Sequence, residues 1–81
     1  MDTRIALIGI IVENMQSTHK VNELLHEYGQ YIVGRMGIPY KEKKVSIISI
    51  VMDADNNTIS SLSGKLGMID GISVKTVYQK V

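Results

Sequence analysis

Two short apolar segments constrain the fold of this chain more than any other feature. Residues 4–12 read RIALIGIIV and residues 45–52 read VSIISIVM, and both are rich in β-branched side chains. Each segment is too short for an ordinary helix and is bounded by polar residues, so each predicts a buried central strand. A helical pattern follows both segments, which indicates two strand–helix units in one chain.

The stretch after the first segment predicts a helix that begins near Asn14 or Ser17. Both are typical N-cap residues, because the side-chain oxygen accepts a hydrogen bond from a free backbone N–H. Apolar side chains then recur at the spacing of one helix face, namely at Val21, Leu24, Leu25 and Tyr28. Gly29 follows at a C′ position, where glycine commonly ends a helix.

A second helix is expected after residues 45–52. Its predicted N-caps are Asp55, Asn56 and Asn57. One face of this helix carries three apolar residues, namely Ile59, Leu62 and Leu66. Gly67 is the predicted C-cap.

The two remaining strands have the character of sheet edges. Residues 31–40 are interrupted by residues that weaken an interior ladder or, for proline, favour an edge or a bulge: Gly34, Gly37 and Pro39. The sequence KEKK then turns the chain back into the second apolar segment. After a turn at Gly71, residues 72–81 alternate between two side-chain sets, as a half-exposed final strand does.

The predicted order of elements is strand, helix, strand, strand, helix, strand. Two right-handed crossovers that share one sheet give the split β-α-β arrangement, with strand order 4-1-3-2 and both helices on one face. The apolar strands then lie at the centre, and the strands with proline or charges lie at the edges. We therefore predict an α+β, ferredoxin-like βαββαβ sandwich with an antiparallel sheet. Because 81 residues suffice for one core, a single domain over residues 1–81 is expected.

The sheet face that the helices leave uncovered is predicted to be apolar. In residues 4–12 the alternation places apolar side chains on both faces, such as Ile8 on one and Leu7 on the other. Residues 45–52 behave in the same way and are broken only at Ser49. A second apolar face requires another surface to cover it, most simply the same face of a second copy. We therefore expect a homo-oligomer.

Composition disfavours several classes of partner. Nine Lys+Arg against eight Asp+Glu give a net charge of +1, which provides no strong field to attract nucleic acid or an anionic membrane. The apolar stretch in residues 4–12 is far shorter than the ~20 residues of a membrane span. The chain has no cysteine, which fits a reducing cytoplasm. We expect a cytoplasmic protein that contacts neither nucleic acid nor membrane directly.

The two histidines define a metal-binding alternative. His19 and His26 are seven residues apart, on one side of the predicted helix but separated by about 10.5 Å along its axis. Nitrogen–metal bonds are ~2.1 Å long, so one chain cannot bring both side chains to one ion. The helical wheel also places both histidines opposite the apolar face, which favours a solvated role. A nickel or zinc site completed by another subunit stays open as the alternative.

Two glycine-containing segments are candidate ligand-binding regions. GRMG, residues 34–37, predicts either a bulge or a backbone opening where an anionic group of a ligand meets Arg35. On the second helix, small residues form a stripe between Ser60 and Gly67. An interior helical glycine costs about 1 kcal/mol relative to alanine, so Gly64 indicates close helix packing, a subunit contact or an interface ligand. The candidate binding residues are Gly34, Arg35, Gly37, Ser60 and Gly64.

The sequence motifs indicate no catalytic site. The chain has no cysteine nucleophile, no G-x-S-x-G turn and no Ser/His/Asp grouping whose placement can be argued from spacing. Neither G-x-G-x-x-G nor the P-loop pattern occurs. We therefore expect a protein that is not an enzyme, and the sequence identifies no cofactor.

Three segments, VNELLHEYG, IVGRMGIPY and ISSLSGKLGMIDGISVKTVY, resemble the family of regulators of the iron-only hydrogenase system. The resemblance covers nearly the whole chain and implies an ACT-like ferredoxin fold in a cytoplasmic protein that forms dimers or tetramers. It also implies a regulatory module that senses a small-molecule effector or contacts a protein partner. The family is similar in fold to the C-terminal domain of nickel-responsive regulators, but this chain has no cysteine for a mixed His/Cys metal site.

Overall fold

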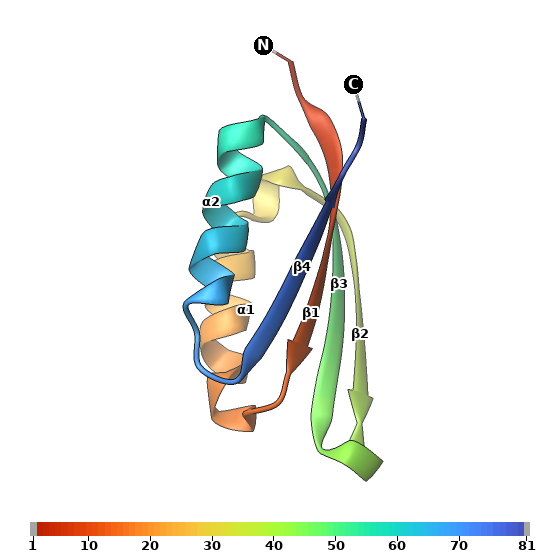
Figure 1. Ribbon diagram of the computed structural model, residues 1–81, viewed down its shortest axis with the longest axis vertical. Helices are drawn as coiled ribbons and strands as arrows, with labels where there is room; N and C mark the ends of the chain where they lie inside the picture. Colours follow the sequence, from red (N-terminus) through yellow and green to blue (C-terminus); the bar gives the residue numbers. More distant parts are fainter. Residues whose placement is uncertain (1, 81) are drawn as a thin grey trace.

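The computed structural model describes residues 2–80, which form one four-stranded sheet with two helices on one of its faces (Figure 1). The strands are β1 (Arg4–Val12), β2 (Ile32–Tyr40), β3 (Val45–Ala54) and β4 (Ile72–Tyr78). The helices are α1 (Thr18–Glu27) and α2 (Asn56–Gly67). Three short 3-10 turns complete the chain: η1 (Met15–Ser17), η2 (Gly29–Tyr31) and η3 (Lys41–Lys43).

The sheet has the strand order β2-β3-β1-β4, and all neighbouring strands are antiparallel. Read from the other edge this order is 4-1-3-2, so the predicted ferredoxin-like α+β fold is confirmed. The two apolar strands, β1 and β3, lie at the centre and pair along their length, from Arg4↔Ala54 to Val12↔Ser46. The interrupted strand β2 and the half-exposed strand β4 are the edges.

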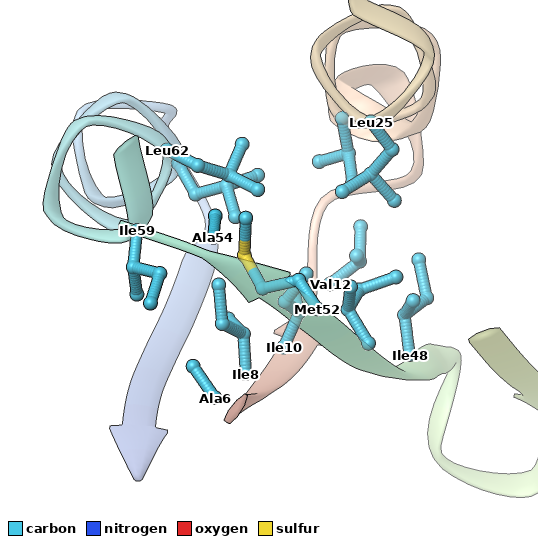
Figure 2. Close-up of a cluster of buried hydrophobic side chains, with 13 residues drawn as sticks. Ala6, Ile8, Ile10, Val12, Leu25, Ile48, Met52, Ala54, Ile59 and Leu62 are labelled. Carbon is cyan, nitrogen blue, oxygen red and sulfur yellow. The ribbon is translucent and has the colours of Figure 1, made fainter. Parts of the chain in front are cut away.

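The hydrophobic core lies between the helices and the sheet (Figure 2). Alternate residues of β1 and β3 supply its floor: Ala6, Ile8, Ile10, Val12, Ile48, Ile50, Met52 and Ala54. The helices close it from above with Val21, Leu25, Ile59, Leu62 and Leu66. Full burial of a large aliphatic side chain contributes about 1.5–3 kcal/mol, so this layer is the main source of stability. Strand periodicity and helix periodicity thus converge on one core.

The start of α1 differs from the prediction in its chemistry. Asn14 Oδ1 accepts a hydrogen bond from the backbone N–H of Gln16 at 3.0 Å, so it caps the turn η1 that precedes the helix. Ser17 occupies the N-cap position of α1, but its hydroxyl donates instead to the carbonyl of Asp70 at 2.7 Å. The prediction that Ser17 caps the helix through its side chain is wrong, because this buried hydroxyl finds an acceptor in the loop after α2.

The ends of α2 confirm one prediction and correct another. Asp55 caps the helix as expected, since its Oδ1 accepts a hydrogen bond from the backbone N–H of Thr58 at 2.8 Å. Gly67 is the last helical residue and Met68 is the C-cap, so the predicted C-cap is one residue early. Among the glycines that the structure describes, Gly71 alone has a positive φ, at +75°. The turn into β4 is therefore the position that needs glycine.

The final strand is shorter than predicted and ends at Tyr78. Gln79 continues the pairing, because its backbone N–H donates to the carbonyl of Ile5 at 2.8 Å and its Oε1 accepts from the Ile5 N–H at 2.9 Å. Met1 and Val81, the ends of the predicted domain, lie outside the described residues. Within residues 2–80 no helix is long and apolar enough to cross a membrane.

Candidate functional site

The sheet surface opposite the helices is exposed and largely apolar, and we call it the open face. The register places Leu7 beside Val51 and Val77 on this face, and Ile11 beside Ile47. Eight of its large apolar side chains are 37–62% exposed: Ile5, Leu7, Ile11, Met36, Ile38, Tyr40, Ile47 and Val77. The predicted second apolar face is therefore present in the structure.

A depression lies on the open face over β1 and the edge strand β4, beside Ile47 of β3. Gly9 of β1 pairs with Ser49 of β3 on one side and with Lys75 of β4 on the other, so small or charged residues interrupt the apolar surface there. The depression has a volume of about 380 Å³ and is bordered by Gly9, Ile11, Ile47, Ser73 and Lys75. Sequence reasoning missed it. Gly9 and Ser49 each break an apolar run, but only the register shows that the two breaks are adjacent.

Arg35 lies on the helix-covered face of the edge strand β2. It pairs with Ile50, whose side chain is fully buried in the core, and its Nη2 donates a hydrogen bond to Asn22 Oδ1 of α1 at 3.0 Å. The register thus settles a point that the sequence leaves open, namely which face of the sheet carries this guanidinium. The hydrogen bond ties the edge strand to the first helix.

The irregularity in β2 lies at the start of the GRMG segment. The register shifts between Ile32 and Gly34, whereas Gly37 pairs regularly with Ile48. Gly34 lies on the open face beside Val51, and Gly37 lies on the helix-covered face. No heavy atom of the described residues lies within 4 Å of a Cβ built on either glycine. The backbone of β2 is therefore open to contact on both faces.

The small residues of α2 dock this helix on the edge strand β4. Ser60 Oγ lies 3.1 Å from the hydroxyl oxygen of Tyr78, and Ser63 Oγ lies 2.8 Å from Oγ1 of Thr76. Gly64 is exposed, and within residues 2–80 its ideal Cβ has no neighbouring heavy atom inside 4 Å. Close helix packing inside the chain is therefore the wrong explanation for this glycine. The other predicted explanations, a subunit contact or an interface ligand, stay open.

The five candidate binding residues do not form one site within a single chain. Gly34, Arg35 and Gly37 lie on β2, whereas Ser60 and Gly64 lie on α2, which packs on β4 (Figure 1). These strands are the opposite edges of the sheet. A site that uses both groups requires residues from two chains.

The two histidines lie on the exposed surface of α1, as the helical wheel predicts. His19 Nε2 is 3.7 Å from Glu23 Oε2, and the two side chains are 83% and 64% exposed. Residues 2–80 contain no group of three or more His, Asp or Glu side chains placed to hold one metal ion. The geometry within one chain therefore adds no support to the metal-binding alternative.

A polar cluster joins the two helices. The hydroxyl oxygen of Tyr28 lies 2.9 Å from Ser61 Oγ, and Lys65 Nζ lies 5.4 Å from the centre of the Tyr28 ring. The contact with Ser61 and, after it, the contact with Lys65 lower the pKa of Tyr28 below its ordinary value. Tyr28 in turn raises the pKa of Lys65. The sequence pattern identified Tyr28 only as part of the apolar face, because its polar partners come from the other helix.

One protein-family model matches this chain, over residues 4–76. Its description is "TM1266-like: Iron-only hydrogenase system regulator, putative". A comparison with curated proteins found no match.

Among solved structures, protein TM1266 from Thermotoga maritima is 42% identical with a TM-score of 0.93, over 98% of this chain and 100% of that chain. A formyltetrahydrofolate deformylase from Pseudomonas putida KT2440 is 13% identical with a TM-score of 0.64, over 94% of this chain and 28% of that chain. The divalent ion tolerance protein CutA1 from Ehrlichia chaffeensis is 12% identical with a TM-score of 0.52, over 100% of this chain and 86% of that chain. The last two share the fold alone. The family model and the 42% identical relative show that this chain belongs to the TM1266-like family.

Proposed function

We propose that this protein is a cytoplasmic, non-enzymatic regulatory module of an iron-only hydrogenase system, and that it works as a homo-oligomer assembled through its open face. The regulatory part is supported by the description of the family. The oligomeric part is carried by one observation, the exposed apolar side chains of the open face. A small effector or a protein partner would act on this assembly.

The size of the open face supports a second copy as its occupant. Four strands at a spacing of about 4.8 Å and a paired length of about seven residues give an area of roughly 450 Å². Two copies would cover roughly 900 Å² measured as flat surfaces, and more as accessible area because the side chains form ridges. Specific interfaces exceed about 1,000 Å² of accessible area, so the face is large enough.

The charges of the open face also suit pairing between identical surfaces. Asp53 of β3 pairs with Ile5, and Lys75 of β4 pairs with Gly9, so both side chains belong to this face. A surface that carries one acid and one base avoids the repulsion that a single sign of charge would cause between like copies. Two-fold pairing of one surface with itself is the commonest arrangement of soluble oligomers.

The predicted binding residues fit a regulatory module only as parts of an assembly. The GRMG segment of β2 and the Ser60/Gly64 stripe of α2 lie at opposite edges of the sheet, where further chains or an effector can reach them. The backbone is accessible at Gly34, Gly37 and Gly64, as a close contact with a ligand or subunit requires. These residues are therefore our proposed sites for an effector or an additional subunit contact.

Thermal melting over a range of protein concentrations tests the proposal. The melting temperature of an obligate oligomer rises with protein concentration, so we expect a rise over a roughly 100-fold range. Ile11→Asp places a charge in the open face and should remove this dependence. Met68→Asp is the matched control, because Met68 is 86% exposed at the end of α2, away from the sheet, and the dependence should persist. A melting temperature of the unmodified protein that does not change with concentration would contradict the proposal.

A further inference from the structure

Gly9 is not required by the backbone that it belongs to. Its φ is not in the positive region, and the nearest heavy atom of the described residues to its ideal Cβ is the carbonyl oxygen of Lys75, at 4.0 Å. A glycine inside a strand is less favourable than alanine and often marks a place where a ligand or another backbone approaches. Glycine at position 9 therefore lowers the stability of β1, and its missing side chain leaves the depression above it unfilled.

The space above Gly9 suits a small organic molecule. Its volume of about 380 Å³ lies in the range of ligand pockets, which begins near 300 Å³. Ile11 and Ile47 supply apolar walls, and Ser73 lies at the border. Lys75 belongs to the same border and, among the lining residues that the structure describes, is the only one with a charged side chain.

Pairing of two open faces would enclose this depression. Because a two-fold interface uses the same surface of both copies, the open face of each copy would cover the depression of the other. Lys75 would then lie in an environment with little water, where an unpaired charge is costly. Asp53, the acid of the same face, pairs with Ile5, four residues along β1 from Gly9, and does not border the depression, so within one chain it is not a partner of Lys75. An anionic group on the ligand removes that cost, since a carboxylate and an ammonium form a charge-assisted hydrogen bond.

We infer that the depression at Gly9 is a ligand site completed by a second copy, and that its ligand is a small organic acid with an apolar body and a carboxylate that binds Lys75. This inference rests on the proposed oligomer and names the class of effector that the oligomer senses. The apolar body contacts Ile11 and Ile47, and the space left by Gly9 admits it between the sheets.

Hexanoate and hexan-1-ol are matched probes for this site, because they share a six-carbon body and differ in the charged group. Binding is measured by titration of the ¹⁵N-labelled full chain, following the backbone amide signals by NMR. A charge-assisted hydrogen bond to Lys75 should make hexanoate bind about tenfold more tightly than hexan-1-ol. The largest shifts are expected at Gly9, Ile11 and Lys75.

Three variants separate the contributions to binding. Lys75→Gln should abolish the preference for hexanoate while leaving the apolar body its contacts. Gly9→Leu should abolish binding of both probes by filling the depression. Val77→Leu is the matched control, since Val77 also lies on the open face, beside Leu7, but does not border the depression, and both probes should bind as before. Should Gly9→Leu disturb pairing, Lys75→Gln alone decides the outcome.

Three results would overturn the inference. The first is equal affinity of the unmodified protein for hexanoate and hexan-1-ol, and the second is unchanged hexanoate binding by Gly9→Leu. The third is a preference for hexanoate that persists in Lys75→Gln. Light scattering on the same samples separates the two proposals. A dimer that binds neither probe removes the ligand site alone, whereas a protein with the mass of one chain removes the oligomer and the site together.

Discussion

Gly71 is constrained by two features of the turn that precedes β4. Its φ of +75° is rarely adopted by residues with a side chain, and an ideal Cβ would lie 2.5 Å from the Cβ of Asn14. The backbone N–H of Glu13 also donates to the Gly71 carbonyl at 2.8 Å, which holds the end of β1 against this turn. A side chain here therefore forces either the turn or the β1–α1 connection to move.

Replacement of Gly71 by alanine is expected to lower the free energy of unfolding by about 1–3 kcal/mol, the usual cost of a strained backbone position. Urea denaturation followed by circular dichroism measures this change. Gly64→Ala is the control, because this helical glycine has no positive φ and its Cβ position is free of neighbours among residues 2–80. Alanine there should raise the free energy of unfolding by about 0.5–1 kcal/mol. Similar losses for both variants would contradict this account of Gly71.

The capping of α2 shows how a single side chain fixes the start of an element. Asp55 stands at the N-cap with an extended backbone, and its carboxylate accepts from the backbone N–H of Thr58. Contacts with the Thr58 side chain and, after it, with its backbone N–H lower the pKa of Asp55 below the ordinary value. The folded state thus favours the ionised form of this carboxyl group.

The stabilising effect of Asp55 depends on pH in a definite direction. A carboxyl group with a lowered folded pKa contributes stability above its unfolded pKa of about 3.9, and this contribution is lost as the pH falls through the lower folded value. Asp55→Ala should therefore lower the melting temperature by a few degrees at neutral pH, and the gap to the unmodified protein should close in acid. Asn57→Ala, in the first turn, is the control and should show no such closing. A gap for Asp55→Ala that is constant from pH 7 to acid would refute this role of the carboxylate.

The elements themselves could be predicted from the sequence because they depend on local patterns. The two apolar runs predicted β1 and β3, and Asp55 predicted the start of α2. The interactions that join elements could not be predicted, since their partners are distant in the chain. The Ser17 hydroxyl donates to Asp70, and Arg35 donates to Asn22, and neither partner follows from spacing.

The whole molecule is organised around a sheet with one buried face and one exposed apolar face. Strand β3 contributes side chains to both faces. Ile50 is fully buried beneath the helices, whereas Ile47 is 37% exposed on the open face. Ile50→Ala should lower the free energy of unfolding by about 2–5 kcal/mol, because it leaves a cavity in the core. Ile47→Ala is the matched change on the other face, and it should make the melting temperature depend less steeply on protein concentration. Equal losses that do not vary with concentration would contradict the assignment of the open face to an interface.

The candidate site illustrates the limit of sequence reasoning for the whole molecule. The apolar second face followed from alternation along single strands, so it could be predicted. The depression at Gly9 could not, because its border combines Gly9, Ile47 and Lys75 from three different strands, which only the sheet register brings together. Likewise the division of the five candidate binding residues between opposite sheet edges depends on topology and on the packing of α2.

The native mass of the purified protein, measured by light scattering before and after addition of a metal chelator, tests the central claim most directly. We expect a mass of at least two 9.0-kDa chains that is unchanged by the chelator, because apolar side chains and not metal ions hold the copies together. A mass of one chain would contradict assembly through the open face. A mass that falls on chelation would contradict it also and would favour a metal bridge through His19 or His26.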